Sequence, residues 1–218
     1  MIRAGLVAVL LAAPLAPGAA QSVRGRLEGR VPVAVIAGVD SLVRQAAREQ
    51  LPTEPLVQKA LEGGAKEVPA ARIVAAVETA LAQLRSSRAL LVGAGDAPPA
   101  TAGEVIAVSA ALRRGVPAPV IERVVAALPA EPRGSALHAV ADLVEHRFAP
   151  DSAADLILAA SHLGLRGERL LDVSTAAVHE LQRGRTRAAA LADVQARLPD
   201  IPAAPKAGHE TVVRARRP

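Results

Sequence analysis

Prolines recur in this chain at the starts of segments whose apolar residues follow a helical period, and this pattern constrains the fold most. Copies of the motif "GVPAPVIERVV" are aligned at Pro52, Pro69, Pro117, Pro150 and, in weaker form, Thr186. Proline suits the first turn of a helix, where its missing N–H would have no partner, and it disfavours helical geometry in the preceding residue. Gly115 and Gly184 stand ahead of two copies and suit left-handed helix C-caps. Each copy therefore predicts a tight corner between two helices.

The spacing of apolar residues between these corners predicts helices. In the segment "SALHAVADLVEHRF", Leu137, Val140 and Val144 recur at intervals of three and four, as on one buried helix face. Ser135 is placed as the N-cap of that helix. The predicted helices cover residues 32–50, 54–63, 69–88, 102–114, 117–129, 136–147, 150–162, 167–183 and 186–197. No segment predicts a strand, so the expected fold class is all-α.

The distances between corners indicate a repeat. The aligned positions 117, 150 and 186 lie 33 and 36 residues apart, which is the period of helical-hairpin repeats. This period resembles that of tetratricopeptide repeats in length and topology, although the Trp, Tyr and Phe positions of that motif have no aromatic counterpart here. The chain is therefore expected to form an irregular helical-hairpin array, similar to an α-solenoid, of about nine helices and no sheet.

The first 20 residues have the pattern of a secretory signal peptide. Arg3 precedes an apolar stretch over 5–15, and small residues at 18–20 predict cleavage near Ala20 and Gln21. The apolar stretch is shorter than the roughly 20 residues that span a bilayer, so an uncleaved anchor is the weaker interpretation. The chain has no cysteine, which excludes a lipid-attached cysteine and disulfides. We expect a periplasmic or secreted protein with no transmembrane segment after signal cleavage.

The positive charge of the chain lies mainly at its ends. Residues 21–30 carry +2 and residues 206–218 carry +3, whereas the body from 31 to 205 carries about −1. Nucleic-acid binding would require basic side chains clustered on the folded surface, so no nucleic-acid partner is predicted. Weak contact of the basic ends with an anionic envelope surface stays open.

Composition shifts divide the chain into segments. The predicted segments are a signal peptide at 1–20, a basic disordered N-terminus at 21–30, an N-terminal helical hairpin segment at 31–88, a Gly/Pro loop at 89–101, a helical-repeat segment at 102–198 and a Pro-rich basic disordered tail at 199–218. The stretch "ALLVGAG" at 89–95 superficially matches a dinucleotide-binding turn, but Pro98 occupies the place of its third glycine. No cofactor is predicted.

The segment 135–146 holds the most chemically suggestive side chains. Ser135, His138 and Asp142 share one side of a helix, whereas a hydrolase triad needs partners that converge from different elements, so no catalytic site is predicted. His138, Asp142 and His146 recur every four residues and are chemically suitable for Zn or Cu. They lie largely opposite the apolar face of the helix, which favours ordinary solvated positions. We predict no metal site and keep this trio as the alternative.

Several arginines lie near predicted helix C-termini, where the helix dipole favours positive charge. They are Arg113, Arg114, Arg183, Arg185 and Arg187. A patch for an acidic partner is left open. Because Phe148 is the only aromatic residue, a typical small-molecule pocket is not expected. The leading hypothesis is an exported, non-enzymatic scaffold or protein-interaction module with an unidentified protein partner. The alternatives are an envelope-associated or metal-handling protein and, third, an enzyme of unrecognised type.

Overall fold

The computed structural model describes residues 22–93 and 100–200, and all regular structure in these ranges is helical. The helices are α1 (Val23–Leu27), α2 (Val33–Arg48), α3 (Glu54–Ala65), α4 (Ala70–Gly93), α5 (Ala102–Arg113), α6 (Ala118–Ala127), α7 (Ala130–Glu145), α8 (Pro150–His162), α9 (Glu168–Gln182), α10 (Arg187–Arg197) and the 3-10 turn η1 (Leu198–Asp200). The prediction of an all-α fold is confirmed for this part of the chain. None of these helices combines the length and apolar character needed to cross a bilayer.

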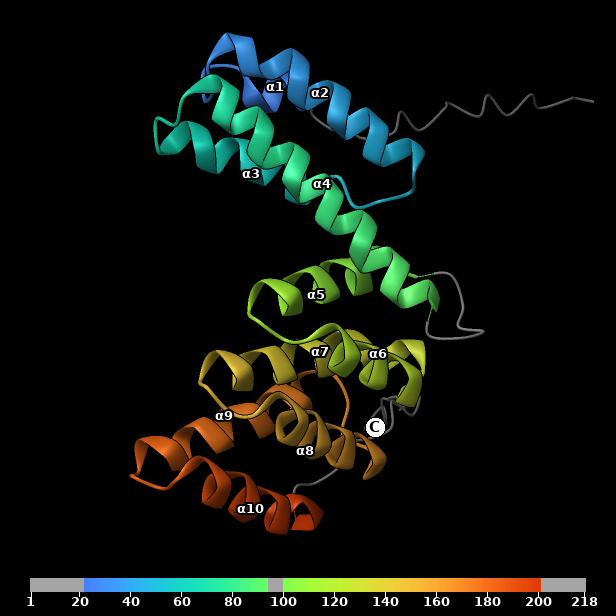
Figure 1. Cartoon of the computed structure of the whole chain (residues 1–218), viewed down its shortest axis with the longest axis vertical. Coiled ribbons are helices and arrows are strands. Elements are labelled where there is room, and N and C mark those ends of the chain that lie inside the picture. Colours follow the sequence, from blue (N-terminus) through green and yellow to red (C-terminus); the bar gives the residue numbers. More distant parts are fainter. Residues whose placement is uncertain (1–21, 94–99, 201–218) are drawn as a thin grey trace, which may run out of the picture.

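Helix α4 connects an N-terminal and a C-terminal group of helices (Figure 1). Helices α2 and α3 pack on α4, and the short α1 packs on α2 and α3. Helix α4 is 24 residues long, and it continues beyond this group to contact α5 and α6. The two groups of helices therefore meet along a single shared helix.

The C-terminal helices stack in two layers (Figure 1). Helices α5, α7 and α9 pack in succession in one layer, and α6, α8 and α10 pack in succession in the other. Neighbours in the chain also pack on each other, as α7 does on α8 and α9 does on α10. This is the contact pattern that a hairpin array requires, while its kinship with α-solenoids stays a prediction.

Six of the corners between the described helices share one hydrogen-bonding pattern, which the α5–α6 corner illustrates. The N–H of Gly115 donates to the carbonyl of Leu112 at 3.1 Å, and the N–H of Val116 donates to Ala111 at 3.0 Å, as in a Schellman motif. The same pair of bonds closes six corners, whose left-handed residues are Gln50, Glu67, Gly115, Arg147, Gly164 and Gly184. The left-handed caps predicted at Gly115 and Gly184 are confirmed, with φ of 88° and 86°.

At most corners a buried residue follows the left-handed position, and at most of them a proline or threonine stands at or near the start of the next helix. Leu51, Val116, Phe148 and Leu165 follow their caps directly and are buried. Pro117 then serves as the N-cap of α6, and Pro150 is the first residue of α8. Thr186 replaces proline at the last corner, where its hydroxyl accepts a hydrogen bond from the N–H of Ala189 at 3.2 Å. The corners predicted from proline positions are therefore present in the structure.

The prediction of a disordered segment at 21–30 is wrong within the described residues, because helix α1 occupies part of it. Ser22 caps this helix by accepting a hydrogen bond from the N–H of Gly25. Leu27 is completely buried, and Arg26 donates two hydrogen bonds of 2.6 and 2.7 Å to Glu54 of α3. One buried leucine and one bidentate ion pair therefore hold the segment against its neighbours.

Two helix boundaries also differ from the predictions by five residues or more. Helix α4 ends at Gly93 rather than near residue 88, because Leu91 is buried against the core. Helix α7 begins at Ala130 rather than 136, so Ser135 lies inside it and is not an N-cap. Pro132 falls in the first turn of α7, where a missing N–H breaks no intrahelical bond. The predicted signal peptide, residues 94–99 of the predicted loop and residues 201–218 of the predicted tail lie outside the described residues.

Candidate functional site

The metal candidates His138, Asp142 and His146 all lie on or directly after α7. The ring Nδ1 of His146 lies 3.8 Å from the Asp142 carboxylate and 2.9 Å from the Asp142 main-chain carbonyl. His138 is half-buried, and this desolvation, together with the charge of Arg114, lowers its pKa. Among residues 22–93 and 100–200, no three His, Asp or Glu side chains converge closely enough to hold a metal ion. The helical spacing of these residues thus brings two of them into contact but assembles no ligand set.

The arginines near helix C-termini mostly serve contacts within the chain. Arg114 lies 3.3 Å from Glu145, and Arg185 lies 2.6 Å from Asp193. Arg183 lies 3.5 Å from Glu180, and Arg187 donates to the main-chain carbonyl of His146 at 3.1 Å. Arg113 differs, since it lines a groove. Three of the five arginines therefore connect neighbouring helices or turns, and Arg183 pairs within the end of its own helix.

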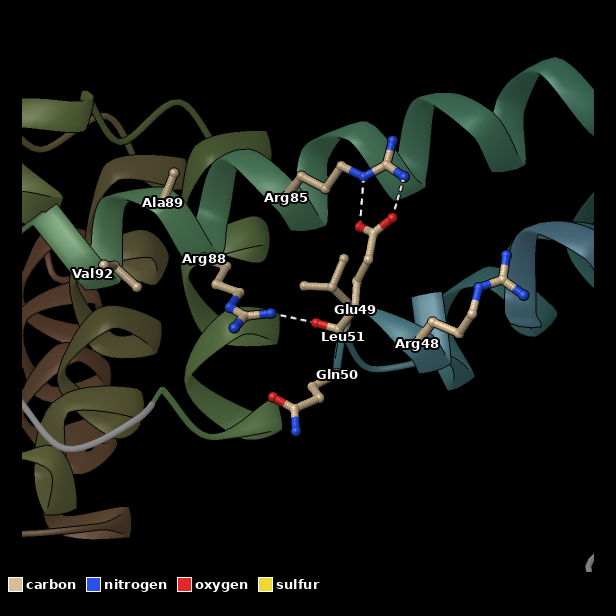
Figure 2. A pocket seen from close by; sticks show the side chains of 8 residues that line it. All are labelled: Arg48, Glu49, Gln50, Leu51, Arg85, Arg88, Ala89 and Val92. Atoms are coloured by element: carbon tan, nitrogen blue, oxygen red, sulfur yellow. Dashed lines mark hydrogen bonds and ion pairs between the residues drawn. The ribbon is translucent and has the colours of Figure 1, made fainter. Parts of the chain in front are cut away.

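Two grooves flank α4 where the N-terminal and C-terminal groups of helices meet. The first, which we call the arginine groove, has a volume of about 520 Å³ and lies between the end of α2 and the C-terminal half of α4 (Figure 2). It is lined by Arg48, Glu49, Gln50, Leu51, Arg85, Arg88, Ala89 and Val92. The α2–α3 corner supplies one wall, because the left-handed Gln50 reverses the chain there.

The apolar part of the arginine groove is accessible to solvent. Ala89 and Val92 lie three residues apart on α4 and therefore share one face of the helix. Val92 is 65% exposed, whereas Leu51 beneath the rim is only 5% exposed. Ala89 and Val92, both exposed, therefore form an apolar strip on this face of α4.

The arginine groove carries more positive than negative charge. Arg85 donates to both carboxylate oxygens of Glu49, at 2.7 and 2.6 Å, and Arg88 donates to the main-chain carbonyl of Glu49 (Figure 2). The hydrogen bonds from Arg85 lower the pKa of Glu49, so this carboxylate stays ionised. No carboxylate in the described ranges lies within ion-pair distance of Arg48 or Arg88. Three arginines and one glutamate line the groove, which leaves an excess of two positive charges.

The second groove is larger and mostly polar, with a volume of about 720 Å³. Its lining residues come from α3, α4 and α5, and they are Pro55, Gln58, Lys59, Glu62, Ala76, Thr79, Ala80, Gln83, Leu84, Ser109 and Arg113. It opens where the stacking is interrupted, because α3 packs on α4 but not closely on α5. Glu62 is bridged by Lys59 at 2.9 Å and Lys66 at 2.6 Å, and these hydrogen bonds lower its pKa to about 2.

No protein-family model matches the chain, and neither a curated protein nor a solved structure matches it. The function of the chain is therefore inferred from the physical character of its surface. Sequence reasoning selected none of the residues of the arginine groove. The available signal was the placement of Arg85, Arg88 and Val92 at helical spacing on α4, but their relation to Glu49 arises only when the end of α2 packs beside α4.

Proposed function

We propose that this chain is an exported, non-enzymatic helical-repeat protein that acts as a scaffold or protein-interaction module in the bacterial periplasm or outside the cell. The pattern of residues 1–20 supports the export. Stacked helical hairpins form extended surfaces suited to protein partners.

The arginine groove is the observation that supports this proposal most directly. Arginine is enriched at protein interfaces, and clustered apolar groups on a surface often mark such interfaces. Here Val92 is 65% exposed and lines the same groove as three arginines. Small-molecule pockets usually enclose most of their ligand, whereas every residue of this groove except Leu51 is at least partly exposed. The geometry therefore favours a protein segment as the ligand.

The proposal is tested by isolating complexes from the periplasm of a bacterium that expresses the tagged full-length chain. A partner that co-purifies in a fixed stoichiometric ratio is expected, and Val92→Glu should remove it by placing an unpaired charge on the apolar strip. Val33→Glu is the matched control, because Val33 is 85% exposed and lies on α2 outside the arginine groove. Absence of any stoichiometric partner, or equal loss with both variants, would contradict the proposal.

A further inference from the structure

The arginine groove combines two recognition elements at one place. Arg48 and Arg88 supply positive charge that no carboxylate of the described residues neutralises, and Ala89 and Val92 supply an exposed apolar strip. A ligand that carries only negative charge would leave this strip exposed to water. An uncharged apolar ligand would desolvate guanidinium groups without pairing them, which costs free energy. The best match is a ligand that carries both kinds of group.

The hydrogen bonds within the groove determine which arginines are available. Arg85 is already paired with both oxygens of Glu49, and this pairing fixes the two side chains in place. One Nη of Arg88 donates to the main-chain carbonyl of Glu49, which orients its guanidinium but leaves its charge unpaired. A planar guanidinium held in this way can still donate to a carboxylate through its remaining N–H groups. Arg88 is therefore positioned beforehand for an acidic group.

We infer that the arginine groove binds a partner segment that carries both aliphatic and carboxylate side chains, with the aliphatic groups on Ala89 and Val92, a carboxylate on the neighbouring Arg88 and a further carboxylate toward Arg48 (Figure 2). This inference rests on the proposed function and adds the chemical class of the partner. It rests on charge complementarity, because an acidic ligand would pair the excess of two positive charges. The exposed aliphatic strip beside Arg88 favours a ligand that is also apolar.

The inference is tested with fluorescent peptides and the full-length chain. The probes are EDLLEDLLE, its uncharged analogue QNLLQNLLQ and its polar analogue EDSSEDSSE, measured by fluorescence polarisation. Only the first should bind in the micromolar range, and each analogue should bind about tenfold more weakly. Raising the salt from about 50 to about 500 mM should weaken binding, because the paired charges lie at an exposed surface. Equal binding of the charged and uncharged peptides would overturn the inference.

Variants locate the binding site. Arg48→Gln should weaken binding of EDLLEDLLE about threefold to fivefold, and this substitution breaks no hydrogen bond within the described residues. Val92→Asp should weaken binding tenfold or more, because it removes apolar area and repels the acidic probe. Arg72→Gln is the matched control, since Arg72 is an exposed arginine near the start of the same helix. Loss of binding with Arg72→Gln equal to that with Arg48→Gln would overturn the assignment to this groove.

A lipid surface also offers anionic and apolar groups, so lipid vesicles are included as a competitor in the same binding measurement. Vesicles of phosphatidylglycerol should not compete with EDLLEDLLE for the protein. If the vesicles bind in a manner that depends on Arg48 and Val92 while the peptide does not, the inference is wrong. Suppose that a stoichiometric periplasmic complex depends on Val92 but is not displaced by EDLLEDLLE. That result would refute the acidic–aliphatic ligand and leave the proposed function standing. Absence of any such complex would instead refute the proposed function.

Discussion

Arg133 and Glu104 form a buried ion pair between α7 and α5, with 2.9 Å between Nη1 and Oε1 and side chains only 5% and 4% exposed. The second Nη of Arg133 donates to the carbonyl of Leu128, which follows the last residue of α6, at 2.8 Å. The other carboxylate oxygen of Glu104 accepts from the N–H and the hydroxyl of Thr101, the N-cap of α5, each at 2.9 Å. One pair of side chains therefore joins the ends of three helices.

Removal of Glu104 should be strongly destabilising. Glu104→Ala leaves the Arg133 charge buried without its partner, and we expect a loss of about 3–5 kcal/mol in the free energy of unfolding. The double variant Glu104→Leu with Arg133→Met removes both charges and should be destabilised less than the single variant. Because the chain has no Trp or Tyr, unfolding is followed by far-UV circular dichroism. A double variant as unstable as Glu104→Ala would show that the charge is not the cause.

The corners allow a comparison at one structural position. Gly115 has φ of 88°, and a Cβ there would meet no atom within 4 Å, so Gly115→Val should cost roughly 1–2 kcal/mol, mainly through the left-handed backbone conformation. Arg147 holds the same position with φ of 65°, and Arg147→Gly should stabilise the fold by about 0.5–1 kcal/mol. Pro117→Ala should change stability by less than about 1 kcal/mol. Thermal melts that rank Pro117→Ala below Gly115→Val in stability would contradict this account of the corners.

Two glycines inside helices should respond in opposite directions to alanine. A Cβ at Gly64 of α3 would overlap the carbonyl oxygen of Arg30, so Gly64→Ala should destabilise by about 1–3 kcal/mol as the backbone moves apart. A Cβ at Gly134 of α7 would meet nothing within 4 Å, so Gly134→Ala should stabilise by about 0.5–1 kcal/mol through helix propensity. Denaturant titration measures both changes, and a stabilising Gly64→Ala would disprove the close approach of α3 to the α1–α2 turn.

His138 should make the fold less stable in mild acid. Burial and the charge of Arg114 lower the pKa of His138 in the folded state, whereas the unfolded chain titrates near the ordinary value of about 6.5. Between these two pKa values the unfolded state binds more protons, so the free energy of unfolding falls as the pH drops below about 6.5. His138→Gln should reduce this dependence between about pH 7 and 5. An unchanged dependence in urea titrations would place His138 in solvent.

A second variant, in which His138 and His146 are both changed to alanine, tests the metal alternative. Calorimetric titration with Zn should give no saturable binding to the wild type, and none that differs when His138 and His146 are both changed to alanine. Micromolar one-to-one binding that disappears in the double variant would overturn this expectation. It would also support the metal-handling alternative over the protein-interaction module.

The corners were the most predictable part of the fold, and the reason is local. Pro117 and Pro150 disfavour a continuous helix whatever surrounds them, and Gly115 adopts a left-handed conformation without steric cost. At Gln50 and Arg147 no glycine marks the left-handed position, although both residues adopt that conformation against their preference. The residues that follow them, Leu51 and Phe148, are buried in the core.

The sequence by itself determined the all-α class and most of the helix boundaries, because apolar period, proline and glycine act within a few residues of where they stand. The tertiary structure decided what depends on distant partners. Leu27 and Arg26 hold α1 in place through contacts with α2 and α3, and the first turn of α7 forms where Arg133 meets Glu104. The arginine groove belongs to the same class, since Glu49 and Val92 line one surface only because α2 ends beside α4.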